Sequence, residues 1–201
     1  MPAQLVLIAV SWVAFLLYWS IAAIGVKQDL PQQGSWGSGH GLLLRLVAAA
    51  ILILVLVLRR GQAFNRLGLL HRLQAAAPGM ASGPVLGTIG ALLCVLGIAC
   101  ALWARWHLGS NWSWRPALKA DHALITSGPY RLVRHPIYSG LLLAVGGSTL
   151  AASWPLVIIP GMLLVVFVRR IHHEEQLLLQ HFPERYPAYQ RRTWALIPWL
   201  Y

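Results

Sequence analysis

Two carboxylates stand side by side in a sequence that has very few of them. The chain holds 5 Asp and Glu against 16 Lys and Arg, and Glu174 and Glu175 follow an apolar run. Neighbouring carboxylates at the edge of a low-dielectric region are unfavourable unless cations compensate them. Arg170 precedes Glu174 by one helical turn and shares its helix face, whereas Glu175 is expected to face another partner. The spacing predicts either an ion pair within the helix or a bipolar site, with Glu174 receiving an ammonium group and Arg170 a carboxylate.

A second polar group lies upstream, at Arg134, His135 and Pro136. The residue before a proline favours extended backbone and proline favours a first helical turn, so a helix is expected to start here. Its N-terminal N–H groups favour an anionic group close to this junction. Tyr130 and Tyr138 add flat apolar rings with hydroxyl tips, which suit adenine or ribose. The alternative is a helix start with an aromatic and basic belt, which is common in membrane proteins.

Other catalytic patterns are missing from the sequence. His172 and His173 are neighbours rather than an i,i+4 metal pair, and the sequence has no HExxH motif, P-loop or GxGxxG motif. Cys94 and Cys100 match no metal or disulfide spacing and indicate small core residues. We therefore expect no metal site.

The composition indicates an integral membrane protein. Hydrophobic residues make up 58% of the chain and charged residues only 10%, whereas roughly a quarter of the residues in a soluble domain are charged. The formal charge of +11 comes from cations that punctuate apolar segments. A nucleic-acid partner is not expected, because such a protein gathers its cations on a soluble module. Instead, the positions of the cations indicate which segments lie at the membrane surface and how the chain is oriented in the membrane.

The hydropathy pattern predicts an all-α fold in one domain, residues 1–201. Three N-terminal spans are expected within residues 1–107, at 5–25, 41–58 and 84–103. Residues 137–168 carry no charge and as one helix would be roughly 48 Å long, well over the hydrocarbon thickness. Breaks at Gly146-Gly147, Pro155 and Pro160 favour a helical hairpin, which would bring His135 and Glu174 to one membrane face.

The remaining topology follows from this hairpin. About five transmembrane helices are expected in total. The excess of cations places the hairpin ends, and hence the active site, on the cytosolic side, although the arginine-rich loop 59–82 is a counter-signal. The segment after Glu175 alternates leucines and aromatic residues with charges, and predicts an amphipathic helix lying on the membrane surface.

Three stretches carry a resemblance to a known family. SGPYRLVRHPIYSG at 127–140, RRIHHEE at 169–175 and HFPERYPAYQRR at 181–192 resemble the isoprenylcysteine carboxyl methyltransferase family and the wider phospholipid-methyltransferase-like group. The resemblance extends from residue 108 to the C-terminus, so residues 108–201 would hold the cofactor-binding loop, the hairpin and the C-terminal helix. The three N-terminal spans match in hydropathy only.

The resemblance implies an S-adenosylmethionine-dependent methyltransferase that lies in the membrane and has no Rossmann domain. Its cofactor would lie between the loop before the hairpin and the C-terminal helix. Arg170 would hold the methyl-accepting carboxylate, and Glu174 would bind the amino group of the cofactor. The other implied cofactor-binding residues are His122, Ala123, Leu124, Ile125, Tyr130, His135, Pro136, Ile137 and Tyr138. Arg115 stands where a related enzyme has a cofactor-contacting Gln.

The expected reaction is methyl transfer to the carboxylate of a prenylated cysteine or a similar lipophilic acceptor. An anionic acceptor needs little acid–base help, so positioning and exclusion of water would supply most of the rate. Arg170 would orient the acceptor rather than act as a base, because arginine stays protonated. The alternatives are an NADPH-dependent, sterol-type membrane reductase, a methyltransferase acting on a phospholipid amine or a thiol, and a non-catalytic membrane scaffold. The oligomeric state is not predicted.

Overall fold

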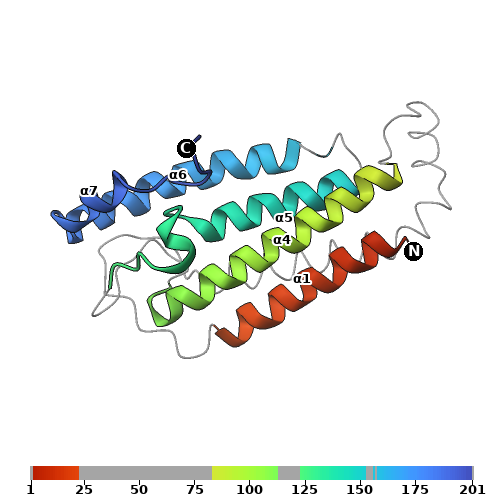
Figure 1. Cartoon of the computed structure of the whole chain (residues 1–201), viewed down its shortest axis with the longest axis horizontal. Coiled ribbons are helices and arrows are strands. Elements are labelled where there is room, and N and C mark those ends of the chain that lie inside the picture. The colour runs from red at the N-terminus through yellow and green to blue at the C-terminus, as the bar shows by residue number, and fades with distance from the viewer. Residues whose placement is uncertain (1, 23–82, 113–122, 153–155, 157, 201) are drawn as a thin grey trace, which may run out of the picture.

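The computed structural model describes residues 2–22, 83–112, 123–152, 156 and 158–200, and these are predominantly helical (Figure 1). The helices are α1 (Ala3–Ala22), α4 (Pro84–Leu108), α5 (Pro136–Ala152), α6 (Ile158–His181) and α7 (Arg185–Gln190), with 3-10 turns η1 (Gly109–Asn111) and η2 (Gly128–Arg131). Within the described residues, β structure is limited to one isolated bridge, between Val133 and Trp194. The all-α prediction is therefore confirmed for this part of the chain.

Helices α1 and α4 run parallel to each other and correspond to the first and third predicted spans (Figure 1). The Gln4 side chain lies against Gly87 at one end, and Arg105 donates a hydrogen bond to the Ala22 carbonyl at the other. Both helices are long and apolar enough to cross a membrane. Helix α4 extends five residues past the predicted end, to Leu108. The predicted span 41–58 and the loop 59–82 lie outside the described residues.

Helices α4 and α5 pack antiparallel along a seam of small residues. Gly90 faces Gly147, and Gly97 faces Gly140. A Cβ atom added to Gly140 would stand 2.6 Å from the Gly97 carbonyl oxygen, so the two backbones are in direct contact. Close approach of small residues is how helices associate where lipid removes the hydrophobic driving force. Cys94 lies in the same seam and is 0% exposed, which confirms its predicted place in the core.

The predicted hairpin is present, but two of its predicted breaks are wrong. Helix α5 ends at Ala152, and α6 begins at Ile158 and runs back alongside it (Figure 1), whereas Pro155 lies outside the described residues. Gly146 and Gly147 lie inside α5, because Gly147 serves contact with α4 rather than a turn. Pro160 is the third residue of α6, a position whose N–H has no partner within a helix, so a proline is tolerated there.

The C-terminal segment differs from the predicted amphipathic helix. Helix α6 continues to His181, α7 has 6 residues, and residues 191–200 are not helical. The backbone N–H groups of Arg134 and His135 donate to the carbonyls of Trp194 and Ala195, at 2.8 and 3.0 Å. The folded-back tail is held in place because its carbonyls accept the backbone N–H groups of the two residues just before Pro136. Contact of this segment with a membrane surface stays a prediction.

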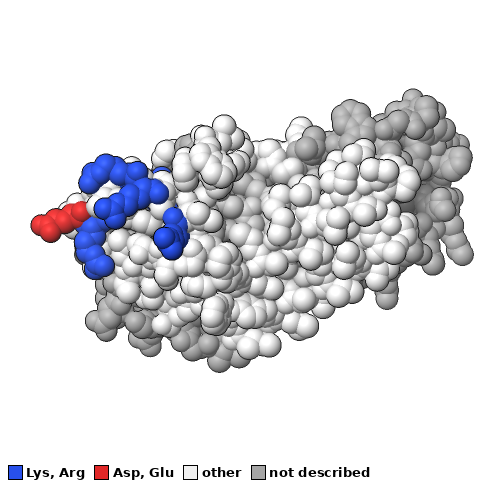
Figure 2. Space-filling model, in the orientation of Figure 1, with Lys and Arg blue, Asp and Glu red and all other residues white. Residues whose placement is uncertain are grey.

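Apolar side chains cover the outside of the long helices, and charge gathers at one end. Figure 2 shows the Lys and Arg side chains of this face at the end where α7 lies in Figure 1. Large exposed apolar residues line α1, α4 and α6, for example Leu17 at 60%, Leu92 at 61% and Met162 at 66%. An apolar exterior of this extent is expected where lipid replaces water.

Candidate functional site

The junction between η2 and α5 is held in place by the C-terminal tail. His135 stands just before α5, and its carbonyl accepts the N–H groups of Tyr138 and Ser139 at 3.0 and 3.1 Å. The Ser139 hydroxyl donates to the Leu196 carbonyl at 2.6 Å. The side chain of His135 is 7% exposed, and Pro136 is fully buried. The first turn of α5 is thus fixed by residues sixty positions away, and it aims His135 and Tyr138 at α6.

Glu174 is the meeting point of α5 and α6. Its Oε1 atom accepts hydrogen bonds from the Tyr138 hydroxyl at 2.6 Å and from Arg170 Nε at 2.9 Å. Its Oε2 atom lies 3.6 Å from His135 Nδ1. The predicted ion pair within the helix is therefore present. The same geometry leaves acceptor capacity on Oε2, since a carboxylate oxygen has two lone pairs.

Glu175 faces a different set of partners, as its position in the helix predicts. Oε1 accepts from Arg134 Nε at 2.7 Å and lies 3.2 Å from His135 Nε2, while Oε2 accepts from Gln190 Nε2 at 3.0 Å. Glu175 lies beyond the apolar part of α6. Burial would raise the pKa of its carboxyl, but the hydrogen bonds from His135 and Arg134 and the charge of Arg134 outweigh burial and lower the pKa to about 2.

Aromatic rings complete the cluster around Glu174. Tyr138 stacks between His135 and Phe167, with ring centroids 5.7 and 4.6 Å away, and Arg170 Cζ lies 5.8 Å from the Tyr138 centroid. Phe167 was missed by the sequence analysis. Its spacing of three and seven residues from Arg170 and Glu174 places all three on one face of α6, and that signal could have identified it.

Tyr130 is 7% exposed and lies near enough to Glu174 for that carboxylate to affect its phenol. Its carbonyl accepts the Tyr189 hydroxyl at 2.6 Å. Burial, followed by the proximity of Tyr189 and Glu174, raises the pKa of the Tyr130 phenol. Arg134, which the sequence analysis placed in the polar group before α5, also donates to the carbonyls of Gln190 and Thr193. Tyr189 is a further residue that the sequence analysis did not assign to the site. Their contacts depend on the return of the tail.

The predicted site residues fall into three groups. His135, Tyr138, Arg170 and Glu174 form the contacts described above, and we call these four residues the Glu174 cluster. Ile137 packs against the hydrophobic core formed with α4. In the loop before η2, Ala123 is exposed and its N–H lies 3.5 Å from Asn111 Oδ1, Leu124 and Ile125 are partly buried, and His122 and Arg115 lie outside the described residues.

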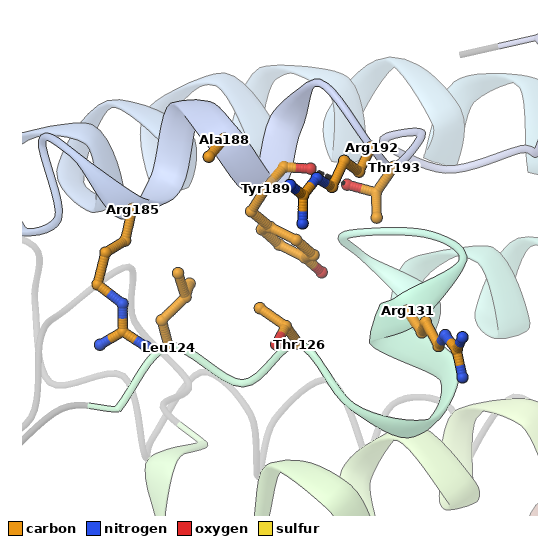
Figure 3. A pocket seen from close by; sticks show the side chains of 8 residues that line it. All are labelled: Leu124, Thr126, Arg131, Arg185, Ala188, Tyr189, Arg192 and Thr193. Atoms are coloured by element: carbon orange, nitrogen blue, oxygen red, sulfur yellow. Dashed lines mark hydrogen bonds between the residues drawn. The ribbon is translucent and has the colours of Figure 1, made fainter.

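A cavity of about 580 Å³ lies between this loop and the α7 region (Figure 3). Its lining comprises Leu124, Thr126, Arg131, Arg185, Ala188, Tyr189, Arg192 and Thr193. Among the predicted cofactor residues that the structure describes, Leu124 alone belongs to this lining. Two lining residues contact neighbours of the cluster: the Thr193 carbonyl accepts a hydrogen bond from Arg134, and the Tyr189 hydroxyl donates to the Tyr130 carbonyl.

Comparison with known proteins gives matches over the part of the chain that holds the Glu174 cluster. Residues 89–180 match the model of the isoprenylcysteine carboxyl methyltransferase (ICMT) family. Protein-S-isoprenylcysteine O-methyltransferase of Tribolium castaneum is 33% identical over 128 residues, which cover 61% of this chain and 45% of that protein. The cobalt-zinc-cadmium resistance protein CzcN of Cupriavidus metallidurans is 32% identical over 119 residues, covering 57% and 50%. The chain spans about half the length of the curated relatives it matches.

A solved structure gives a match of similar extent. The eukaryotic intramembrane Ras methyltransferase ICMT matches with a TM-score of 0.53 and 31% sequence identity, covering 57% of this chain and 42% of that chain. Together with the apolar helices α1 and α4, this confirms the integral membrane class. The region that holds Arg134-His135-Pro136 and the Glu174-Glu175 pair lies within the matched residues. Residues 89–180, which hold both of these motifs, therefore match the isoprenylcysteine carboxyl methyltransferase family.

Proposed function

We propose that the protein transfers a methyl group from S-adenosylmethionine to the carboxylate of a prenylated cysteine or a similar lipophilic acceptor. The observation that supports this most is the pairing of Arg170 and Glu174 on one face of α6, against the aromatic wall of Tyr138 and Phe167. Such a site offers a cation for a carboxylate and a carboxylate for an ammonium group, next to an apolar interior. The family and the names of the curated relatives support the same reaction.

The residues of the Glu174 cluster fit the donor groups of S-adenosylmethionine. Glu174 Oε2 has His135 Nδ1 as its neighbour at 3.6 Å, beyond ordinary hydrogen-bond length, so it can still accept an ammonium N–H. Tyr130, His135, Pro136 and Tyr138 would supply flat and apolar walls for the adenosyl part, and residues 122–125 would line it from the preceding loop. When bound, the cofactor would supply an electrophilic methyl group on a sulfonium.

Arg170 would then position the acceptor. A guanidinium has five N–H donors in a fixed fork, so it can hold Glu174 through Nε and a second carboxylate through its terminal nitrogens. The acceptor is already anionic, so no general base would be needed; Arg170 would orient an acceptor oxygen in line with the S–CH3 bond, and S-adenosylhomocysteine would be the leaving group. The rate would come from orientation and from the partial burial of Arg170, 26% exposed, and Glu174, 21% exposed.

The placement of this site follows from the topology. We infer a multi-pass protein whose Glu174 cluster faces the cytosol, because the exposed arginines of the described residues gather at this end and cations are retained on that side. An apolar acceptor tail would reach Arg170 from the lipid, while the cofactor would arrive from water. A cysteine introduced at exposed Glu184 should react with a membrane-impermeant maleimide only in inside-out vesicles; reaction in right-side-out vesicles instead would reverse the orientation.

A titration of the detergent-purified protein tests the cofactor. S-adenosylmethionine should bind saturably, and Glu174→Gln should weaken binding by about tenfold or more, because a charged hydrogen-bond partner is worth roughly 1.5–3 kcal/mol. NADPH is titrated in parallel. Saturable NADPH binding without S-adenosylmethionine binding would instead support the reductase, and binding of neither would support the scaffold.

The acceptor role of Arg170 has a separate test. Arg170→Gln should lower kcat/KM for N-acetyl-S-farnesylcysteine by about 100-fold or more while changing cofactor affinity by less than about threefold, since oriented binding of the carboxylate carries the rate. Arg169→Gln, which removes an exposed neighbouring charge, is the matched control and should stay near the wild-type rate. Equal rates for all three proteins would exclude the assignment. A phospholipid amine and a thiol acceptor are assayed alongside.

A further inference from the structure

Three large apolar side chains stand exposed near the end of the tail, residues 191–200. Ile197 is 44% exposed, Trp199 85% and Leu200 77%. They belong to one tight turn, because the Leu200 backbone N–H donates to the Ile197 carbonyl at 3.1 Å. Contiguous exposed apolar side chains often mark a surface that contacts a partner or a membrane. We call residues 197–200 the terminal turn.

The backbone of the terminal turn is unusual as well. Pro198 and Trp199 occupy its two central positions, and Trp199 has a φ of 65°. A proline followed by a residue with positive φ is typical of a type II turn, where glycine or asparagine normally takes the second position. A bulky residue is strained in this conformation. The Trp199 ring lies 5.6 Å from the Trp194 ring between centroids, yet Trp199 stays largely exposed, which indicates that its ring has a role outside the turn.

The path of the tail brings the terminal turn to the edge of the apolar layer. The tail meets α5 first at His135, whose N–H donates to the Ala195 carbonyl, and then at Ser139, whose hydroxyl donates to the Leu196 carbonyl. Four helical residues rise about 6 Å, so the tail advances along the uncharged run 137–168 as it approaches the turn. Figure 1 shows the C-terminus back along α6 from α7, level with the start of α5.

Helix α4 marks the same level independently. Gly140, the residue after Ser139, packs against Ala101, since a Cβ atom on Gly140 would stand 2.7 Å from the Ala101 backbone N. Trp103 and Trp106 follow within about two turns and are 48% and 68% exposed. Tryptophans gather at the membrane–water boundary because they join an apolar ring to a polar N–H. The terminal turn thus lies close to a boundary that two tryptophans of α4 already mark.

We propose that the terminal turn is seated in the lipid bilayer, with Ile197, Trp199 and Leu200 at the boundary between headgroups and acyl chains. A bilayer rather than a protein is the partner, because the turn stands at the level where the apolar exterior of the helices begins. The tail also carries the carbonyls that accept the backbone N–H groups of Arg134 and His135. Seating of the turn therefore keeps the tail closed on the start of α5, and lipid contact is linked to the site.

Nitroxide labels test where the terminal turn lies. Leu200→Cys and Glu184→Cys are each labelled in protein whose Cys94 and Cys100 are replaced by alanine, with one protein per lipid nanodisc. Glu184 is exposed just before α7 and serves as the site in water. Oxygen concentrates among acyl chains and a nickel chelate stays in water, so the oxygen-to-nickel collision ratio should be about threefold or more higher at residue 200 than at residue 184.

Two outcomes of the labelling would overturn the proposal. Equal ratios at residues 200 and 184 would place the terminal turn in water. Shielding of residue 200 from both reagents would show that protein, rather than lipid, covers the turn.

Hydrogen exchange of the Arg134 and His135 amides in nanodiscs tests the link to α5. Trp199→Gly removes the ring and suits the positive φ, so a turn held by its own backbone would keep the tail closed as well or better. Seating in lipid instead predicts exchange about tenfold or more faster, because the tail opens more often without the ring. Trp106→Ala removes another exposed tryptophan, from α4, and as the matched control should change exchange by less than about twofold.

The exchange results also decide between opening of the tail and loss of the fold. Unchanged or slower exchange in Trp199→Gly would overturn the proposal, as would an equal acceleration in Trp106→Ala. The buried α4 residues Ala91 and Ala101 should keep their exchange rates in both variants, and acceleration there in Trp199→Gly would also contradict a local role of the tail. Neither readout needs a ligand, so failure of this proposal and failure of the proposed methyl transfer are distinguishable.

Discussion

The seam between α4 and α5 and the junction around Glu174 and Glu175 are assembled in opposite ways. In the seam, Gly90, Gly97, Gly140 and Gly147 bring two backbones into direct contact with few polar side chains. At the junction, α5, α6 and the tail are joined by short polar contacts of two glutamates. The seam depends on the absence of side chains, whereas the junction depends on the chemistry of each one. The first should therefore be broken by added volume and the second by lost charge.

The largest effect is expected from volume in the seam. A Cβ at Gly147 would stand 2.5 Å from the Cys94 backbone N, and a Cβ at Gly146 would meet nothing within 4 Å. Gly147→Leu should destabilise the protein by about 3 kcal/mol or more, since backbone atoms cannot move aside. Gly146→Leu, one residue away, should be neutral or stabilising, because leucine is the better helix former. Thermal unfolding in detergent measures the stability change of both variants. Similar losses in the two would contradict close packing of α4 against α5 at Gly147.

The next effect is expected from charge at the junction. Arg134 is 13% exposed and bonds to Glu175 and to the carbonyls of Gln190 and Thr193. Arg134→Gln should cost about 3 kcal/mol, because it leaves a buried carboxylate without its main cation. Arg134→Gln with Glu175→Gln should recover part of this loss. The unfolding free energies of the two single variants and the double variant form a double-mutant cycle. Strictly additive losses would show that Arg134 and Glu175 are not coupled.

A smaller effect is expected from pH. The Glu175 carboxyl has a folded-state pKa of about 2 against an ordinary value of 4.5, so its contribution is complete above about pH 5 and is lost as pH falls through about 2. This contribution is on the order of 2 kcal/mol. Glu175→Gln should remove the part of the acid destabilisation that lies in this window. The measurement is thermal stability between pH 6 and pH 2, and identical slopes for both proteins would rule out the depressed pKa.

The smallest effect is expected from a single hydroxyl. Tyr138→Phe removes the 2.6 Å hydrogen bond to Glu174 and keeps the stacking between His135 and Phe167. Stability should fall by about 1 kcal/mol, as for a typical buried hydrogen bond. Tyr189→Phe, which loses its bond to the Tyr130 carbonyl, is the matched control and should cost a similar amount. A much larger change in S-adenosylmethionine affinity for Tyr138→Phe alone would sharpen the assignment of the site around Glu174.

The sequence pattern predicted the α5–α6 hairpin, but it misplaced some of the breaks between helices. The uncharged run 137–168, with Pro155 in its middle, was enough to predict the hairpin, because its length exceeds one membrane crossing. Gly146-Gly147 was misinterpreted as a break, since a glycine needed for close packing and a glycine needed for a turn look alike in sequence. Only the position of α4 shows which role Gly147 has.

The sequence by itself determined the helical membrane class, the start of α5 at Pro136 and the placement of Arg170 and Glu174 on one helix face. Each of these depends on local rules: hydropathy, proline geometry and helical spacing. Only the tertiary structure decided that the tail returns to bind the backbone before α5, and that Glu175 is held by Arg134 and Gln190. The partners in those contacts lie far apart along the chain, and no local preference of either partner specifies the other.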